Sequence, residues 1–164
     1  MDVKGLIDQY AAYDLWANTR LVDRLQREPD NVLDRHVKSS FPSLRATLMH
    51  IRDAECVWQL RLNGQPNRWP AEEGRQLDGL IKYCTLLHDH VRGLKPEELQ
   101  AKVTYSSLRG EEFTQTRLQL LMHCFNHSSY HRGQVITLMR QLDLDEVPNT
   151  DLVQYQRMLS KRVS

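Results

Sequence analysis

Apolar residues recur at three- and four-residue steps in four long stretches of the chain, which is the pattern of helices with one buried face. These stretches span approximately residues 6–25, 44–62, 77–91 and 116–142. In the first of them the pattern predicts that Asp14 faces outward. Four long helices with short or medium connections predict an all-α fold, a four-helix bundle.

Two further segments depart from this pattern. In residues 102–114, alternating positions with β-branched or aromatic side chains flank Gly110, which predicts a small β-hairpin before the long fourth helix. Two strands are marginal alone, so the hairpin is expected to lean on the helices. After Pro148, Asp151 is a candidate cap for a short extra C-terminal helix that holds Leu152, Tyr155 and Leu159.

Length and composition narrow the class of protein. The 164 residues suit one domain, residues 1–164, and 40% hydrophobic with 26% charged residues is ordinary for a globular chain. A net charge of +1 without clustered cations argues against nucleic-acid binding. There is no run of 18 apolar residues, the sequence starts with no signal-peptide pattern, and three cysteines form no Cys-x-x-Cys pair. We therefore expect a cytoplasmic protein that does not associate with membranes.

The fourth stretch becomes polar halfway along, where His127 and His131 lie four residues apart. On a helix, this spacing separates them by about 6 Å of rise and roughly 40° of rotation, so both rings leave the same face. That geometry suits a divalent metal ion, although two solvated histidines on a helix flank would have the same spacing. Position 128 is Ser, whereas a His-Glu-x-x-His protease needs Glu there.

A catalytic metal site usually has three protein ligands and an open position. The spacing leaves the third ligand open among five histidines: His36, His50, His88, His90 and His123. Of these, His50 lies beside an inward-facing apolar row near the middle of its helix, and His123 is better placed as a neighbour of the pair than as a ligand. Arg132 needs a carboxylate partner if it points inward, and Asp53 or Glu55 could either fill that role or orient a ligating histidine. The candidates to surround the ligands are thus Asp53, Glu55, His123, Arg132 and Gln134.

Four segments in order resemble the DinB-like (YfiT-like) metalloprotein superfamily. They are His127-x3-His131-Arg132-Gly133-Gln134, the Trp-Ala-Asn segment within Tyr13–Asn18, the segment Leu48–Glu55 followed by Trp58, and Pro148–Tyr155. The resemblance implies an up-down-down-up bundle, usually a homodimer, with zinc or nickel held by His50, His127 and His131. One departure is mild, because many relatives have Gly near Leu142, where this chain continues with Asp143-Leu144-Asp145.

Characterised members of that superfamily include transferases and isomerases that use low-molecular-weight thiols. The leading hypothesis is therefore a metal-dependent enzyme that acts on a small-molecule substrate as a thiol S-transferase. Two alternatives stay open, a metal-dependent hydrolase and a non-catalytic metal-binding dimer. The ligand set does not separate transferase from hydrolase, because an open position on the metal accepts either sulfur or oxygen.

Overall fold

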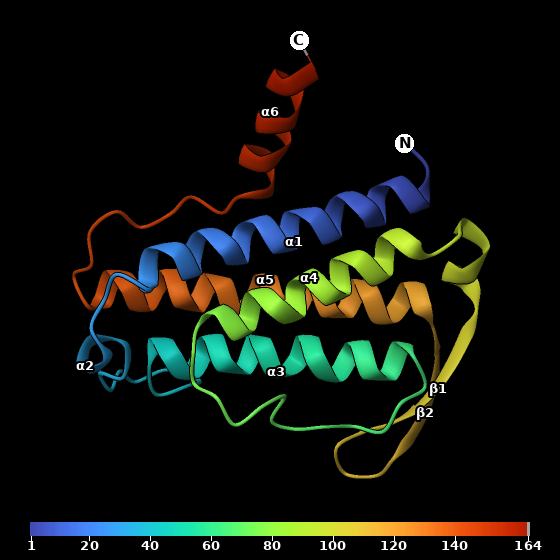
Figure 1. Ribbon diagram of the computed structural model, residues 1–164, viewed down its shortest axis with the longest axis horizontal. Helices are drawn as coiled ribbons and strands as arrows, with labels where there is room; N and C mark the ends of the chain where they lie inside the picture. Colours follow the sequence, from blue (N-terminus) through green and yellow to red (C-terminus); the bar gives the residue numbers. More distant parts are fainter. Residues whose placement is uncertain (164) are drawn as a thin grey trace.

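The computed structural model describes residues 1–163, and this part of the chain is mainly helical (Figure 1). The helices of the bundle are α1 (Val3–Leu25), α3 (Leu44–Leu62), α4 (Asp78–Gly93) and α5 (Arg117–Gln141). The smaller elements are α2 (Asp30–Leu33), the 3-10 helix η1 (Pro96–Gln100), β1 (Lys102–Ser106), β2 (Glu112–Thr116) and α6 (Leu152–Val163). The four long helices, the hairpin and the terminal helix confirm the predicted elements. Helix α2 and η1 are additional, since elements of one turn are too short to show a periodic pattern.

The four long helices form an up-down-down-up bundle, as predicted. In Figure 1, α1 and α5 run from right to left, whereas α3 and α4 run from left to right. Helix α1 packs mainly against α4, and α3 packs against both α5 and α4. The centre of α5 therefore faces the centre of α3, where the histidines of the two helices are located.

Local sequence determines where the two histidine-bearing helices begin. Ser43 is the N-cap of α3, and its hydroxyl accepts a hydrogen bond from the backbone N–H of Ala46. Thr116 caps α5 in the same way, and Gln119 returns a bond to the backbone N–H of Thr116. These caps determine the residue at which each helix begins, and so the position of each histidine along its helix.

The buried core has two apolar halves with a polar layer between them. One half includes Leu21, Leu25, Leu48, Leu80 and Leu138. The other half includes Ile7, Leu62, Leu87, Leu121 and Phe125. Between these halves, at mid-height of the bundle, lies a layer of buried polar side chains that we call the polar layer: Asp14, Asn18, Glu55, Cys84, Ser128 and Arg132.

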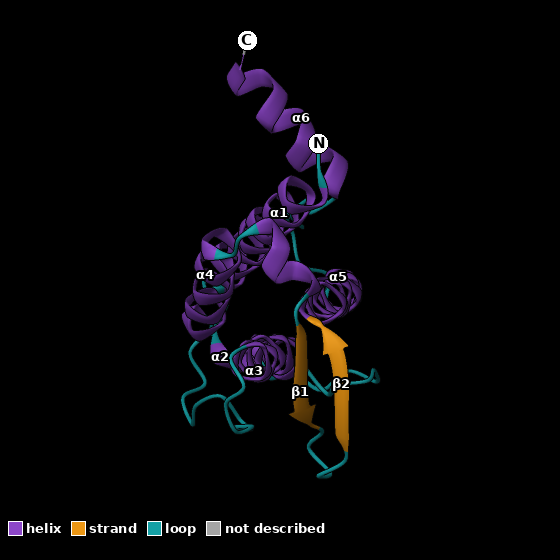
Figure 2. Cartoon of the chain, turned by 90° about the vertical axis from the view of Figure 1, so that its right-hand side faces the viewer, coloured by secondary structure: helices purple, strands orange, loops and turns teal. Residues whose placement is uncertain are grey.

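The hairpin and α6 lie at the periphery of the bundle (Figure 2). Strands β1 and β2 pair antiparallel with Tyr105 opposite Phe113, and β1 contacts α3 while β2 leads directly into α5. Tyr155 of α6 packs on the rings of Tyr13 and Trp16 in α1. No helix in the described part of the chain is both long and apolar enough to span a lipid bilayer.

Candidate metal centre

Three histidine rings converge between α3 and α5. The Nε2 atom of His127 lies 3.0 Å from Nε2 of His50 and 3.1 Å from Nε2 of His131. The ligand atoms of the three side chains all lie within 4.8 Å of one another, which makes them a group that could hold a metal ion. Of the five candidates for the third position, the structure thus brings His50 to the pair.

The spacing of these nitrogens fits a divalent ion. Imidazole nitrogens bind Zn²⁺ at about 2.0–2.1 Å, and two ligands at a tetrahedral angle are then about 3.3 Å apart. The separations of 3.0 and 3.1 Å are close to that value. Three ring nitrogens at this spacing cannot all be satisfied by hydrogen bonds to one another, because each bond needs one donor and one acceptor. A shared cation at their meeting point satisfies all three lone pairs.

Gln134, one turn after the pair, orients His131. The Nδ1–H of His131 donates to Oε1 of Gln134 at 2.8 Å, and Nε2 of Gln134 donates to the hydroxyl of Ser40 at 3.1 Å. A proton held on Nδ1 leaves the lone pair of His131 on Nε2, which points to the other two rings. Gln134 therefore fixes both the tautomer and the angle of this ring.

The environment keeps two of the rings neutral. Burial, followed by the neighbouring His131, lowers the pKa of His50 to about 4, with Asp53 opposing the shift. Burial and the adjacent histidines lower the pKa of His127 to about 3. A neutral imidazole is the form that binds a metal ion, so both rings are ready to act as ligands at neutral pH.

Aromatic side chains surround the three histidines. Phe41 stacks on His50 at a centroid distance of 4.2 Å and meets His131 edge-on at 5.5 Å. Trp69 packs against His50 at 5.6 Å, and Tyr130 against His131 at 5.0 Å. Trp69 and Tyr130 are 42% and 63% exposed, so the group lies under an aromatic rim at the protein surface. Sequence reasoning missed this rim, because Phe41 and Trp69 lie in connecting segments without periodicity.

Replacement of Gln134 by Leu should weaken metal binding by about 10–100-fold, which is the usual loss when the hydrogen-bond partner of a ligating histidine is removed. The leucine cannot accept the proton of His131 Nδ1, so the ring loses its fixed orientation. Isothermal titration of the metal-free protein with Zn²⁺ measures the affinity. Gln141→Leu, at an exposed position near the end of α5, is the matched control. Equal affinities for both variants would show that Gln134 does not position the ring.

Of the remaining histidines, only His123 lies beside the group. Its ring centroid is 6.1 Å from that of His127 and 4.6 Å from Trp58. Burial and the nearby Arg61 lower its pKa. His36, His88 and His90 do not belong to the converging group. His123 also lines a cleft of about 490 Å³ between the hairpin and helices α3 and α5. None of the three converging histidines lines this cleft, and the ring of His123 is what connects it to His127.

The carboxylate partner of Arg132 is neither Asp53 nor Glu55 but Asp14 of α1, which is 2% exposed. The expectation that Asp14 faces outward was therefore wrong. Asp53 is engaged elsewhere, because it accepts hydrogen bonds from Arg52 Nε and from the backbone N–H of Ala71. No hydrogen bond joins Asp53 to a histidine within the described residues.

The polar layer connects α5 to α1 and α4. Arg132, adjacent in sequence to His131, donates to Asp14 and, at 2.7 Å each, to the hydroxyls of Ser128 and Ser129. Asn18 of α1 donates to Asp14, Ser128 and Cys84. These bonds hold the turn of α5 that carries His127 and His131. In them both serine hydroxyls accept hydrogen bonds from Arg132.

Glu55 is the member of the polar layer without an obvious partner. It is 1% exposed, and neither of its oxygens has a hydrogen-bond partner. Burial, followed by the charge of Asp14, raises the pKa of Glu55 well above its usual value. A protonated Glu55 can donate to the Asp14 carboxylate, which resolves its lack of a partner. Asp14, Glu55 and Cys84 have the spacing of metal ligands, but Arg132 and Asn18 already occupy Asp14.

Glu55→Gln should flatten the dependence of stability on pH. The pKa of Glu55 is higher in the folded protein than in the unfolded chain, so above the unfolded value the folded protein binds more protons. Stability of the wild type therefore falls as the pH rises toward the folded pKa, by at most about 1.4 kcal/mol per pH unit. Glutamine keeps the shape and a donor but does not titrate.

Urea unfolding between about pH 5 and about pH 9 measures this effect. Relative to the wild type, Glu55→Gln is expected to gain stability as the pH rises, whereas Glu97→Gln, at an exposed glutamate, should follow the wild-type curve. If the free energies of unfolding of the wild type and of Glu55→Gln changed with pH in parallel, Glu55 would not be protonated in the folded protein.

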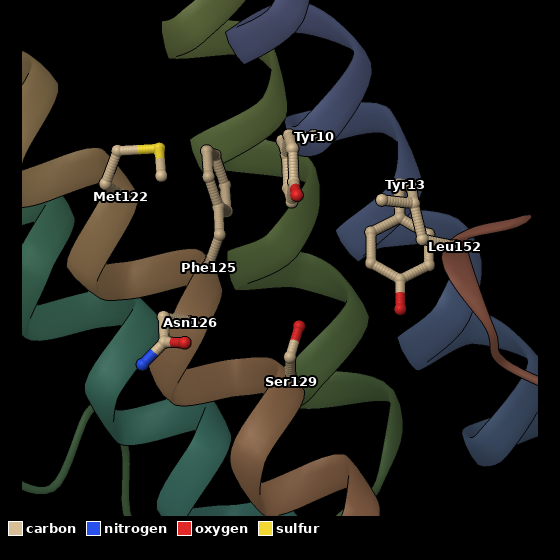
Figure 3. A pocket seen from close by; sticks show the side chains of 7 residues that line it. All are labelled: Tyr10, Tyr13, Met122, Phe125, Asn126, Ser129 and Leu152. Atoms are coloured by element: carbon tan, nitrogen blue, oxygen red, sulfur yellow. The ribbon is translucent and has the colours of Figure 1, made fainter. Parts of the chain in front are cut away.

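A separate groove of about 280 Å³ lies on the other side of α5 (Figure 3). Tyr10 and Tyr13 of α1 face Phe125 and Ser129 of α5 across it, and Leu152 closes one end. None of the three converging histidines lines this groove. It holds no carboxylate, histidine or cysteine side chain, so it offers no chemistry comparable to that of the histidine group.

Comparison with known proteins agrees with this fold. The model of the DinB family matches residues 1–162. Protein DinB of Bacillus subtilis is 24% identical over 159 residues, which cover 83% of this chain and 86% of that protein.

Two crystal structures of DinB-like proteins share the fold. One, from Bacillus subtilis, has a TM-score of 0.65 at 16% identity and covers 87% of this chain and 97% of its own. The other, from Bacillus cereus, has a TM-score of 0.63 at 19% identity, with 84% and 91% covered. At these identities the structures support the fold alone. The match of the family model over nearly the whole sequence shows that the chain belongs to the DinB family.

Proposed function

We propose that this protein is a metal-dependent enzyme in which His50, His127 and His131 hold one divalent ion, and that it transfers a low-molecular-weight thiol to a small electrophilic substrate. The observation that carries the proposal is the convergence of the three rings, in which Nε2 of His127 lies 3.0 Å from Nε2 of His50 and 3.1 Å from Nε2 of His131, near a cleft that can admit a substrate. Zinc and nickel are the ions that the resemblance to the DinB-like superfamily implies, and imidazole suits both.

The donor set determines which chemistry is available. Neutral imidazoles contribute no negative charge, so an ion held by them keeps its full charge and a position open to an outside ligand. A divalent ion held by His50, His127 and His131 would lower the pKa of a thiol or a water molecule that reaches it, which is the chemistry that it would supply. Gln134 holds the ring of His131, while Phe41, Trp69 and Tyr130 limit the access of water.

The thiol must come from outside the chain. Cys56, Cys84 and Cys124 are all buried, and none of them belongs to the three-histidine group. Burial raises the pKa of Cys84 and of Cys124 well above the usual value for a thiol, which keeps both unreactive. An external thiol at the open position has no competitor from the protein itself.

The broader expectations stay predictions in this proposal: one domain over residues 1–164, a homodimer, and a cytoplasmic location, where thiols are kept reduced. Sedimentation of the purified protein tests the dimer directly.

The proposed reaction is tested with metal-free protein reloaded with Zn²⁺ or Ni²⁺ and purified without a histidine tag. Glutathione or cysteine serves as the thiol and 1-chloro-2,4-dinitrobenzene as the electrophile. In this reaction a carbon–sulfur bond forms, the carbon–chlorine bond breaks, and the proton of the thiol is released with chloride. Only the metal-loaded wild type should consume the thiol above the uncatalysed rate, and His127→Ala should not.

His36→Ala, at an exposed histidine outside the group, is the control and should keep wild-type activity. Equal rates in wild type and His127→Ala would reject the metal-dependent transfer. Metal-dependent cleavage of esters or amides, without thiol transfer, would identify the alternative hydrolase. Strong stabilisation by metal without turnover of any substrate would identify a non-catalytic metal-binding protein.

A further inference from the structure

The cleft beside the candidate metal centre is walled by aromatic rings from three parts of the fold. Trp58 comes from α3, Tyr105 and Phe113 come from the two strands, and His123 comes from α5. Its volume of about 490 Å³ lies in the range of small-molecule sites. Phe113 is 45% exposed, although it is a large apolar residue. Aromatic walls of this kind favour flat, apolar ligands over flexible polar ones.

A cation without a counterion lies against two of these rings. The guanidinium carbon of Arg61 is 4.4 Å from the ring centroid of Trp58 and 5.1 Å from that of Tyr105. Arg61 is 6% exposed, and its Nε donates to Asn67, which in turn donates to backbone carbonyls of the hairpin. The arginine is therefore fixed in place by its surroundings.

In the described part of the chain, no carboxylate forms an ion pair with Arg61, unlike the buried Arg45, Arg52 and Arg132. Burial lowers the pKa of Arg61, which reflects the cost of a charge in a poorly solvated place. Buried cations are normally paired, so an unpaired one points to an anion that is supplied from outside.

From these observations we propose that the cleft binds the electrophilic co-substrate, and that this co-substrate is a flat, conjugated carboxylate. The aromatic walls contact its planar body. The charge of Arg61, which lies against the rings of Trp58 and Tyr105 but is not itself among the residues that line the cleft, attracts its carboxylate. His123 links the cleft to the metal group, since its ring lies between Trp58 and His127. The inference rests on the proposed function only where it calls this ligand a co-substrate. The binding of the carboxylate to the cleft needs no metal.

The test uses metal-free protein at about pH 8. Cinnamate is the anionic ligand, and cinnamamide, of the same shape but uncharged, is its partner. In an NMR titration of the backbone amides, cinnamate should bind about 10–100-fold more tightly than cinnamamide, because a positive charge nearby in a poorly solvated place attracts the anion. The shifted amides should belong to β1, β2 and the second half of α3.

Two variants separate the contributions. Arg61→Gln should remove the preference for cinnamate, whereas Phe113→Ala, at an exposed ring, should weaken both ligands. Arg109→Gln removes an exposed positive charge of the same hairpin and should change neither affinity. Circular dichroism verifies that each variant is folded, and Phe113→Ala keeps the test valid if Arg61→Gln does not fold.

The inference would be overturned if cinnamate and cinnamamide bound with equal affinity, or if neither bound. It would also be overturned if Arg109→Gln reduced the preference for cinnamate as much as Arg61→Gln does. The outcome is independent of the proposed function. If cinnamate binds but no metal-dependent transfer is found, the proposed function fails and the anion site stands. If transfer is found but cinnamate does not bind in the cleft, the inference fails and the proposed function stands.

Discussion

Asp14→Ala lowers the free energy of unfolding by about 3–5 kcal/mol, as expected when one partner of a buried ion pair is removed. Arg132 is 2% exposed and Asp14 is the carboxylate that it contacts. Without that carboxylate, the guanidinium stays in the core with only hydroxyl groups as partners. Urea unfolding of metal-free protein measures the loss without a contribution from metal binding.

Two further variants show that the loss comes from the unpaired charge. Removing both charges, in Asp14→Leu with Arg132→Met, should recover much of the stability, because well-packed apolar residues often replace a buried pair at little cost. Asp8→Ala breaks an ion pair at the surface of the same helix and should cost less than about 1 kcal/mol. If Asp14→Ala had the same free energy of unfolding as Asp8→Ala, water would have to reach the guanidinium of Arg132.

The second large effect is expected at the metal centre. Replacing His127 by Ala removes one of three ligands and should lower the affinity for Zn²⁺ by about 10²–10⁴-fold, on the assumption that each ligand supplies roughly a third of a binding free energy of 10 kcal/mol or more. His127 is the ring whose Nε2 is close to both other Nε2 atoms. Metal analysis after dialysis and isothermal titration measure the loss.

The same change should abolish the stabilisation by metal. Zinc at 1,000 times its dissociation constant adds about 4 kcal/mol to the stability of a protein that binds it only when folded. The wild type and the exposed-site variant His36→Ala should therefore melt at a lower temperature after chelation, and His127→Ala should show no such shift. Full zinc content in His127→Ala, or melting of the wild type unaffected by chelator, would rule out the three-histidine centre.

Much of the fold could be predicted from the chain because the signals are local. Helical periodicity over fifteen or more residues identified each long helix. The hairpin was visible as a change from helical periodicity to alternation. The spacing of His127 and His131 on one helix likewise depends only on helix geometry.

Other features depend on contacts between distant segments. The pattern of α1 placed Asp14 outside, because aspartate is usually solvated and Arg132 lies 118 residues away. Periodicity marks which face of a helix is apolar, but it does not reveal that the bundle has a polar layer at mid-height. The partner of an inward-facing charge is decided by the neighbouring helix, so Asp53 and Glu55 were reasonable candidates that the packing did not select.

The sequence by itself determined the four long helices, the hairpin, the terminal helix and two histidines on one face of α5, since each follows from residues a few positions apart. Only the tertiary structure decided that His50 meets these two, that Asp14 neutralises Arg132, and that Trp58, Tyr105 and His123 line one cleft. The physical reason is that these features are distances between separate elements. Such distances are determined by how helices and strands pack, which no local pattern specifies.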